Sequence, residues 1–140
     1  MGRSILAVFA GLLMGAMVTA LIEWAGYQLY PVPIGLADVD AAMADYLRNA
    51  PAGSVLMSLA WFFGGCDGAL IAAWWAPQQP WRHGFIVVAI LLLVAALMLL
   101  QVAHPAWLNW AAPLTYFVAG LVGCKVGSML HDKRRAGIAR

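Results

Sequence analysis

Residues 85–100 read FIVVAILLLVAALMLL, an uninterrupted run of apolar side chains in the second half of the chain. A helix needs about 20 predominantly apolar residues to cross a hydrocarbon core of about 30 Å. Together with the residues that follow it, the stretch predicts a transmembrane helix over about 85–102. The rest of the chain is interpreted as further membrane-embedded helices and their connections.

The composition of the whole chain also indicates a membrane-embedded fold. Of its 140 residues, 64% are hydrophobic and 10% are charged, whereas a soluble domain is about 45–50% apolar and about 25% charged. A chain this short cannot bury so much apolar surface in a core of its own, because small domains bury a lower fraction of their surface. Lipid must therefore surround it, and the composition excludes a soluble fold.

Hydropathy divides the chain into four spans, each long enough for a membrane-crossing helix. They cover about 4–30, 53–76, 85–102 and 107–130. One long connection (31–52) and a tail (131–140) complete what we expect to be a single integral membrane domain. The predicted fold is all-α, a four-helix transmembrane bundle.

The long connection is acidic and has the pattern of a short amphipathic helix from about Val39 to Asn49. Asp38 is a suitable N-cap, because its carboxylate accepts hydrogen bonds from the first free N–H groups of a helix. One face of this helix carries apolar side chains, namely Val39, Met43, Tyr46 and Leu47. We expect the helix to lie on the membrane surface or to cap the bundle. A lid or docking surface is the alternative.

The basic residues predict the orientation of the chain. One side of a four-span chain carries Arg3, Arg82, Lys125, Lys133, Arg134, Arg135 and Arg140, and the other carries only Arg48. Loops rich in lysine and arginine stay in the cytoplasm, so we expect both termini to be cytoplasmic and the long connection to be periplasmic. The expected location is the bacterial inner (cytoplasmic) membrane, crossed several times.

A cleavable signal peptide is a competing interpretation of the first span. Met1-Gly2-Arg3 precedes an apolar run that reaches Val18-Thr19-Ala20, as in secretory signals. The apolar character continues to Tyr30, however, which gives a full span, and we favour an uncleaved helix. Cleavage would not change the orientation of the other three spans.

Three charged residues lie inside the expected spans and form a candidate intramembrane polar site: Glu23, Asp67 and Lys125. Such charges cost about 2.5–3.5 kcal/mol for Asp, Lys or Arg at the bilayer centre and are candidates for function. At 1.5 Å per residue, Glu23 lies about 10 Å from the periplasmic surface, Asp67 about 21 Å and Lys125 about 27 Å. Asp67 and Lys125 are therefore close enough in depth to pair if their helices touch, whereas Glu23 is too far away.

Glu23 follows a row of small residues spaced by four: Ala7, Gly11, Gly15 and Thr19. Small residues let a second helix approach closely, so we expect Glu23 to point into a helix interface. Burial favours the neutral form of a carboxyl group, and we expect Glu23 to be mostly protonated at pH 7. Two roles remain open: a hydrogen-bonded glutamate that holds the bundle or an oligomer together, and a proton- or cation-binding carboxylate in a transport path.

Glycine pairs spaced by four occur in three of the spans. They are Gly11 with Gly15, Gly64 with Gly68, and Gly123 with Gly127. Glycine at this spacing allows two helix backbones to come together. We predict that these faces pack helices tightly and that copies of the chain assemble through them.

Nothing in the sequence indicates an enzyme. It contains no Ser/His/Asp or Cys/His arrangement and no phosphate-binding glycine loop. Cys66 and Cys124 lie inside apolar runs and are interpreted as packing residues, and His83, His104 and His131 are interpreted as structural. We therefore expect no catalytic residue, no metal site and no cofactor.

The stretch Glu23–Gly35 reads EWAGYQLYPVPIG, which is an E-x-x-G-x-x-x-Y-P-x-P-x-G signature. It resembles a group of small uncharacterised bacterial four-helix inner-membrane proteins. The similarity extends through the acidic connection to the WFFGG segment at 61–65. The resemblance implies a four-helix membrane fold and carries no known activity.

We expect a small polytopic membrane protein that serves as a structural or accessory subunit, either as a homo-oligomer or within a larger membrane complex. The alternative is a small proton- or cation-coupled transporter or channel that uses Glu23 and Asp67. The net charge of only +2 does not suggest a nucleic-acid partner. Attraction to the anionic lipid bilayer accounts for the basic tail segment HDKRR.

Overall fold

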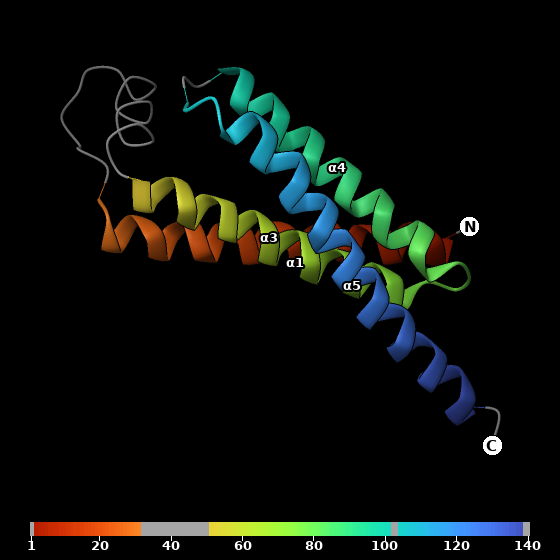
Figure 1. Ribbon diagram of the computed structural model, residues 1–140. Helices are drawn as coiled ribbons and strands as arrows, with labels where there is room; N and C mark the ends of the chain where they lie inside the picture. The colour runs from red at the N-terminus through yellow and green to blue at the C-terminus, as the bar shows by residue number, and fades with distance from the viewer. Residues whose placement is uncertain (1, 32–50, 102–103, 139–140) are drawn as a thin grey trace.

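The computed structural model describes residues 2–31, 51–101 and 104–138, and the regular secondary structure in these ranges is α-helix (Figure 1). The helices are α1 (Gly2–Leu29), α3 (Pro51–Trp75), α4 (Pro80–Gln101) and α5 (Leu108–Ile138). Each is long and apolar enough to cross a membrane. The prediction of an all-α, multi-pass membrane protein is therefore confirmed. The short helix expected over Val39–Asn49 lies outside the described residues.

Two helices extend beyond the spans expected from hydropathy. α4 begins at Pro80 rather than near Phe85, because proline suits the first turn of a helix, where its missing N–H is not needed. α5 continues past Leu130 to Ile138, because the basic residues of this segment are good helix formers. Hydropathy marks where a helix lies in lipid, and a helix can continue beyond the lipid.

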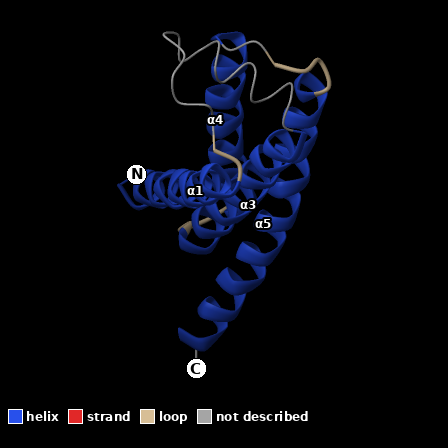
Figure 2. Cartoon of the chain, turned by 90° about the vertical axis from the view of Figure 1, so that its left-hand side faces the viewer, coloured by secondary structure: helices blue, strands red, loops and turns tan. Residues whose placement is uncertain are grey.

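α3 lies at the centre of the bundle (Figures 1 and 2). α1 packs along α3 in the antiparallel direction, and α5 packs along another side of α3 in the parallel direction. α4 runs antiparallel to α5 and also contacts α3 and α1. In Figure 1 the α1–α3 pair and the α4–α5 pair cross, and the N-terminus lies at the same end as the connection between α3 and α4.

The contact between α1 and α3 is made by glycine on both sides. A Cβ atom built on Gly11 would lie 2.6 Å from the Gly68 carbonyl oxygen, and one built on Gly15 would lie 2.8 Å from the Gly64 carbonyl oxygen. No side chain fits at these distances without displacing backbone. The two helices therefore touch backbone to backbone, as small residues in membrane helices allow.

Glycines of α5 bring it against α3 in the same way. A Cβ atom on Gly127 would meet the Leu70 carbonyl oxygen at 2.5 Å, and one on Gly123 would collide with the Cys66 carbonyl oxygen. All three glycine pairs identified in the sequence therefore lie at contacts between helices of a single chain.

One face of α4 is buried, although its sequence is apolar all round. Gly84 lies against the Cys124 sulfur and near the Ala69 carbonyl oxygen, and Val87 is fully buried. The other face, which includes Leu93, is exposed and is available to lipid. An apolar sequence alone does not distinguish lipid-facing from protein-facing positions, because both environments favour the same residues.

Candidate functional site

The structure brings α3 and α5 into contact but does not pair Asp67 with Lys125. No salt bridge joins these two residues, both of which belong to the described part of the chain. The reason is the direction in which they leave their helices. α3 turns Gly64 and Gly68 toward α1, and it turns Gly65 and the Cys66 backbone toward α5. Asp67 is left on the outward side, together with the exposed Phe63. Lys125 lies opposite the glycine face of α5 and is exposed.

The two charges nevertheless lie at similar depth in the bundle. The two glycines that flank Lys125 contact α3 at Cys66 and at Leu70, and these α3 residues bracket Asp67. At 1.5 Å per residue, Lys125 and Asp67 lie within about 5 Å of each other along the helix axis. The depth inferred from the sequence agrees with this geometry, whereas the direction of the side chains could not be inferred.

Glu23 lies apart from the other two charges. Glu23 is partly buried and lies within electrostatic range of Tyr116 on α5, but no hydrogen bond joins these two described side chains. Tyr116 is 3% exposed and stacks on Trp61 with 6.2 Å between ring centroids and 22° between ring planes. The antiparallel register of α1 and α3 places Glu23 about 14 Å from Asp67 along the helix axes. The three charged residues therefore do not form one site.

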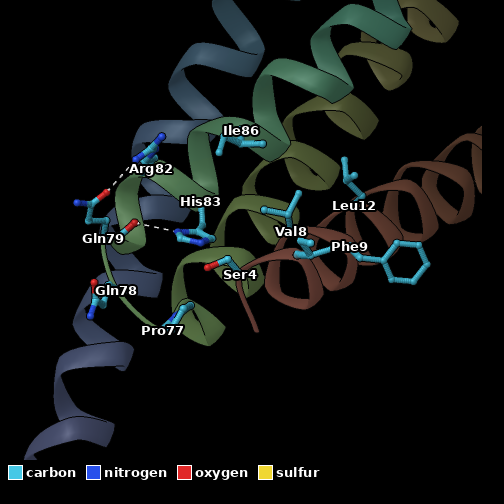
Figure 3. Close-up of a pocket in the computed structure, with 11 residues that line it drawn as sticks. Ser4, Val8, Phe9, Leu12, Pro77, Gln78, Gln79, Arg82, His83 and Ile86 are labelled. Atoms are coloured by element: carbon cyan, nitrogen blue, oxygen red, sulfur yellow. Dashed lines mark hydrogen bonds between the residues drawn. The ribbon is translucent and has the colours of Figure 1, made fainter. Parts of the chain in front are cut away.

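A pocket with a volume of about 970 Å³ opens at the end of the bundle where α1 begins (Figure 3). Its walls come from the first turns of α1, the connection between α3 and α4, and the first turns of α4. The lining residues are Ser4, Ile5, Val8, Phe9 and Leu12 from α1, Pro77, Gln78 and Gln79 from the connection, and Arg82, His83 and Ile86 from α4. The pocket thus combines an apolar wall with a polar rim.

Gln79 accepts the hydrogen bonds that connect the polar residues at the rim of this pocket. Its backbone has a φ of 50°, the left-handed conformation, and its carbonyl oxygen lies 3.2 Å from Nδ1 of His83. A carbonyl oxygen only accepts hydrogen bonds, so Nδ1 carries the hydrogen and Nε2 of the neutral ring is an acceptor. Arg82 Nη1 donates to the Gln79 side-chain oxygen at 3.4 Å. His83 itself is only 9% exposed.

The sequence did not indicate this pocket. From the sequence, His83 is expected to be structural and Arg82 is expected to be a topology signal. Ser4, which lies far away in the sequence, had no assigned role. A cluster of arginine, histidine and glutamine beside a proline-rich connection is a weak signal, and only the packing of α1 against α4 completes the cavity.

The other two histidines lie elsewhere. His104 is hydrogen-bonded to Asn109 at 3.0 Å, beside a smaller, mainly apolar pocket of about 380 Å³ between α4 and α5. His131 is buried near the end of α5, and its Nδ1 has no hydrogen-bond partner within the part of the chain that the structure describes. In these same ranges, no group of His, Cys, Asp and Glu side chains could hold a metal ion.

No family model, no curated protein and no solved structure matches this chain. The comparisons therefore assign no role to Glu23, to Asp67 and Lys125, or to the pocket at the start of α1.

Proposed function

We propose that the chain is a structural or accessory membrane protein that assembles with a second copy of itself, Asp67 of each copy pairing with Lys125 of the other. The observation that carries this proposal is the position of the two charges. The two side chains lie at similar depth along the bundle and face outward, and no salt bridge joins them. A charge inside the bilayer is costly, by up to about 2.5–3.5 kcal/mol at the centre and less toward the surface, and pairing two charges across an interface offsets part of that cost.

The symmetry of a membrane dimer suits this pairing. A twofold axis along the membrane normal keeps both copies at the same depth, so residues that meet across the axis must be level. Asp67 and Lys125 meet that condition, and the symmetry then gives two ion pairs for each dimer. Apolar residues are exposed around both charges: Phe63 beside Asp67 on α3, and Val118, Val122 and Met129 beside Lys125 on α5.

The proposed assembly surface differs from the one expected from the sequence. The glycine faces are occupied by contacts within the chain, so a second copy cannot reach them without opening the bundle. The glycines build the fold, and the outward faces of α3 and α5 supply the contact with the second copy.

Charge reversal tests the proposal. Asp67→Lys or Lys125→Asp should weaken association, because each change opposes two like charges. The double variant should restore association with the signs exchanged. Association is measured by energy transfer between fluorescently labelled copies in lipid vesicles, with Lys133→Asp in the tail as the control. A double variant that stays dissociated like the single variants would contradict the pairing.

Co-purification distinguishes a homo-oligomer from an accessory subunit of a larger complex. The wild-type chain is recovered from native membranes in mild detergent and its companions are identified. Recovery of copies of this chain alone supports a self-contained oligomer. Constant recovery with a second protein supports an accessory subunit.

A proton- or cation-coupled transporter is the second candidate, and the partly buried carboxyl group of Glu23 inside the bundle favours it. Acidic side chains within membrane helices recur in the proton relays of pumps and transporters. Asp67 would then be a second proton- or cation-binding residue, about 14 Å from Glu23 along the helix axes. Glu23→Gln keeps the shape but removes the titrating group, so transport should stop while assembly persists. A structural role predicts no change in either.

We also propose that the chain lies in the bacterial inner membrane with both termini in the cytoplasm, and that its role is not enzymatic. The seven-to-one distribution of basic residues supports this orientation. The start of α1 and the connection between α3 and α4, which carry Arg3 and Arg82 nearby, lie at one end of the bundle (Figure 1).

A further inference from the structure

We propose that the pocket between α1 and α4 binds one anionic phospholipid, with Arg82 and Ser4 at the headgroup phosphate and His83 at a headgroup hydroxyl. This site is independent of the assembly through Asp67 and Lys125, because it lies on other helices and at the end of the bundle.

The polarity of the pocket changes along the bundle in the way that a phospholipid requires. Ser4 and the Gln79–Arg82 segment lie at the outer end, and Leu12 and Ile86 lie deeper. From Ser4 to Leu12, α1 rises about 12 Å. Trp75 and Trp81 are exposed beside the polar end, and tryptophan is enriched where a membrane meets water. The polar end therefore lies at headgroup depth, and the apolar wall lies beside the acyl chains.

The charge of the pocket selects an anionic ligand. Arg82 is a lining residue, and no carboxylate is found among the described residues that line the cavity. A guanidinium group binds phosphate oxygens through charge-assisted hydrogen bonds, and the Ser4 hydroxyl can donate another. The ammonium group of a zwitterionic lipid has no carboxylate here to bind. Basic pockets between membrane helices bind anionic headgroups for this reason.

His83 makes the choice of headgroup more specific. Its ring is nine-tenths buried and lies between Gln79 and Ser4 on the pocket side of α4 (Figure 3). Nδ1 donates to the Gln79 carbonyl oxygen, which leaves Nε2, a hydrogen-bond acceptor in a neutral imidazole, for the ligand. A headgroup hydroxyl supplies the hydrogen for this bond, and a second phosphate oxygen does not. The expected ligand class is therefore a phospholipid with an anionic phosphate and a hydroxylated headgroup, as in phosphatidylglycerol.

Native mass spectrometry of the full-length chain in detergent tests this site. Phosphatidylglycerol, phosphatidylethanolamine and phosphatidylcholine are added in turn, and the fraction of protein that retains one lipid is measured. We expect phosphatidylglycerol to be retained about fivefold more than phosphatidylcholine. Arg82→Gln should reduce its retention about fivefold, which is the effect of one basic residue at an anionic headgroup. Arg135→Gln removes the same charge from the end of α5 and should have no effect.

Three results would overturn the proposal. They are equal retention of all three lipids, equal losses in Arg82→Gln and Arg135→Gln, and displacement of the lipid by millimolar inorganic phosphate, which would indicate a phosphate site. The lipid preference is measured on the wild-type chain, so it tests the proposed phospholipid site even if Arg82→Gln does not fold. Val8→Trp provides an independent check, because an indole in the apolar wall should displace the acyl chain.

Discussion

The Thr19 hydroxyl of α1 donates a hydrogen bond to the backbone carbonyl oxygen of Ala60 in α3, with 3.3 Å between the two oxygen atoms. The same hydroxyl occupies the space that a side chain on Gly64 would need. The bond therefore depends on the glycine contact beside it. Lipid offers no partner to a polar group, so hydrogen bonds between membrane helices stabilise a bundle, by about 0.6 kcal/mol each on average.

Thr19→Val should lower the free energy of unfolding by about 0.6 kcal/mol, because it removes the hydroxyl and keeps the branched shape. Thr19→Ser retains the donor and should restore most of the difference. Unfolding in mixed micelles with increasing denaturing detergent measures both variants. Equal stability of the Val and Ser variants would show that the hydrogen bond contributes nothing.

Gly11→Leu should disrupt the fold of a single chain rather than only its assembly. A leucine there would have to displace the Gly68 carbonyl oxygen and the Ala72 side chain, and overpacking costs about 1–3 kcal/mol or more. Leu93→Ala on the exposed face of α4 is the control and should change stability little. Both are measured by helical content and by elution as a single species in detergent. A well-folded Gly11→Leu variant would contradict the observed backbone contact.

The membrane helices could be predicted from the sequence. A segment in lipid must be a long apolar helix whose backbone groups are hydrogen-bonded to one another, and the hydrophobicity of the residues is enough to locate such a segment. The packing of the helices could not be predicted in this way. Gly64 and Gly65 are neighbours in the sequence but face α1 and α5 respectively. Which glycine meets which helix depends on the rotation and register of every neighbour, and these are properties of the assembled bundle.

In the candidate site, too, one property could be predicted from the sequence and another could not. Depth follows from counting residues at 1.5 Å each, and the similar depth of Asp67 and Lys125 was predictable for that reason. Direction requires knowing which sides of a helix are already occupied, and α3 is occupied on the sides that face α1, α4 and α5. The pocket at the start of α1 was missed because its walls come from segments far apart in the sequence.

Gln79 should tolerate glycine and resist β-branched residues. Its φ of 50° is left-handed, a conformation that costs an ordinary residue about 1–2 kcal/mol. Gln79→Val should therefore destabilise the chain by more than about 1 kcal/mol, since branching at Cβ makes this conformation worse, and Gln79→Gly should be as stable as the wild type. Thermal unfolding of the two variants in the same detergent checks this. Equal stability of Gln79→Val and Gln79→Gly would argue against a left-handed turn.

The orientation of the chain has a direct test. A reporter that is active only in the periplasm should work when inserted near Asp40 and fail when fused after Arg140, because basic flanks remain in the cytoplasm. A reporter that is active only in the cytoplasm should give the reverse pattern and serves as the control. Periplasmic activity at Arg140 would reverse the proposed orientation.

The length of α5 has a consequence for the environment of its charged end. Its 31 residues extend over about 46 Å, well beyond a hydrocarbon core of about 30 Å, and its C-terminal end projects past the other helices (Figure 1). The last glycine contact with α3 is at Gly127, and the helix continues beyond it to Ile138. The charged segment after Gly127 therefore extends as helix out of the hydrocarbon core, where anionic headgroups and water can surround its basic residues.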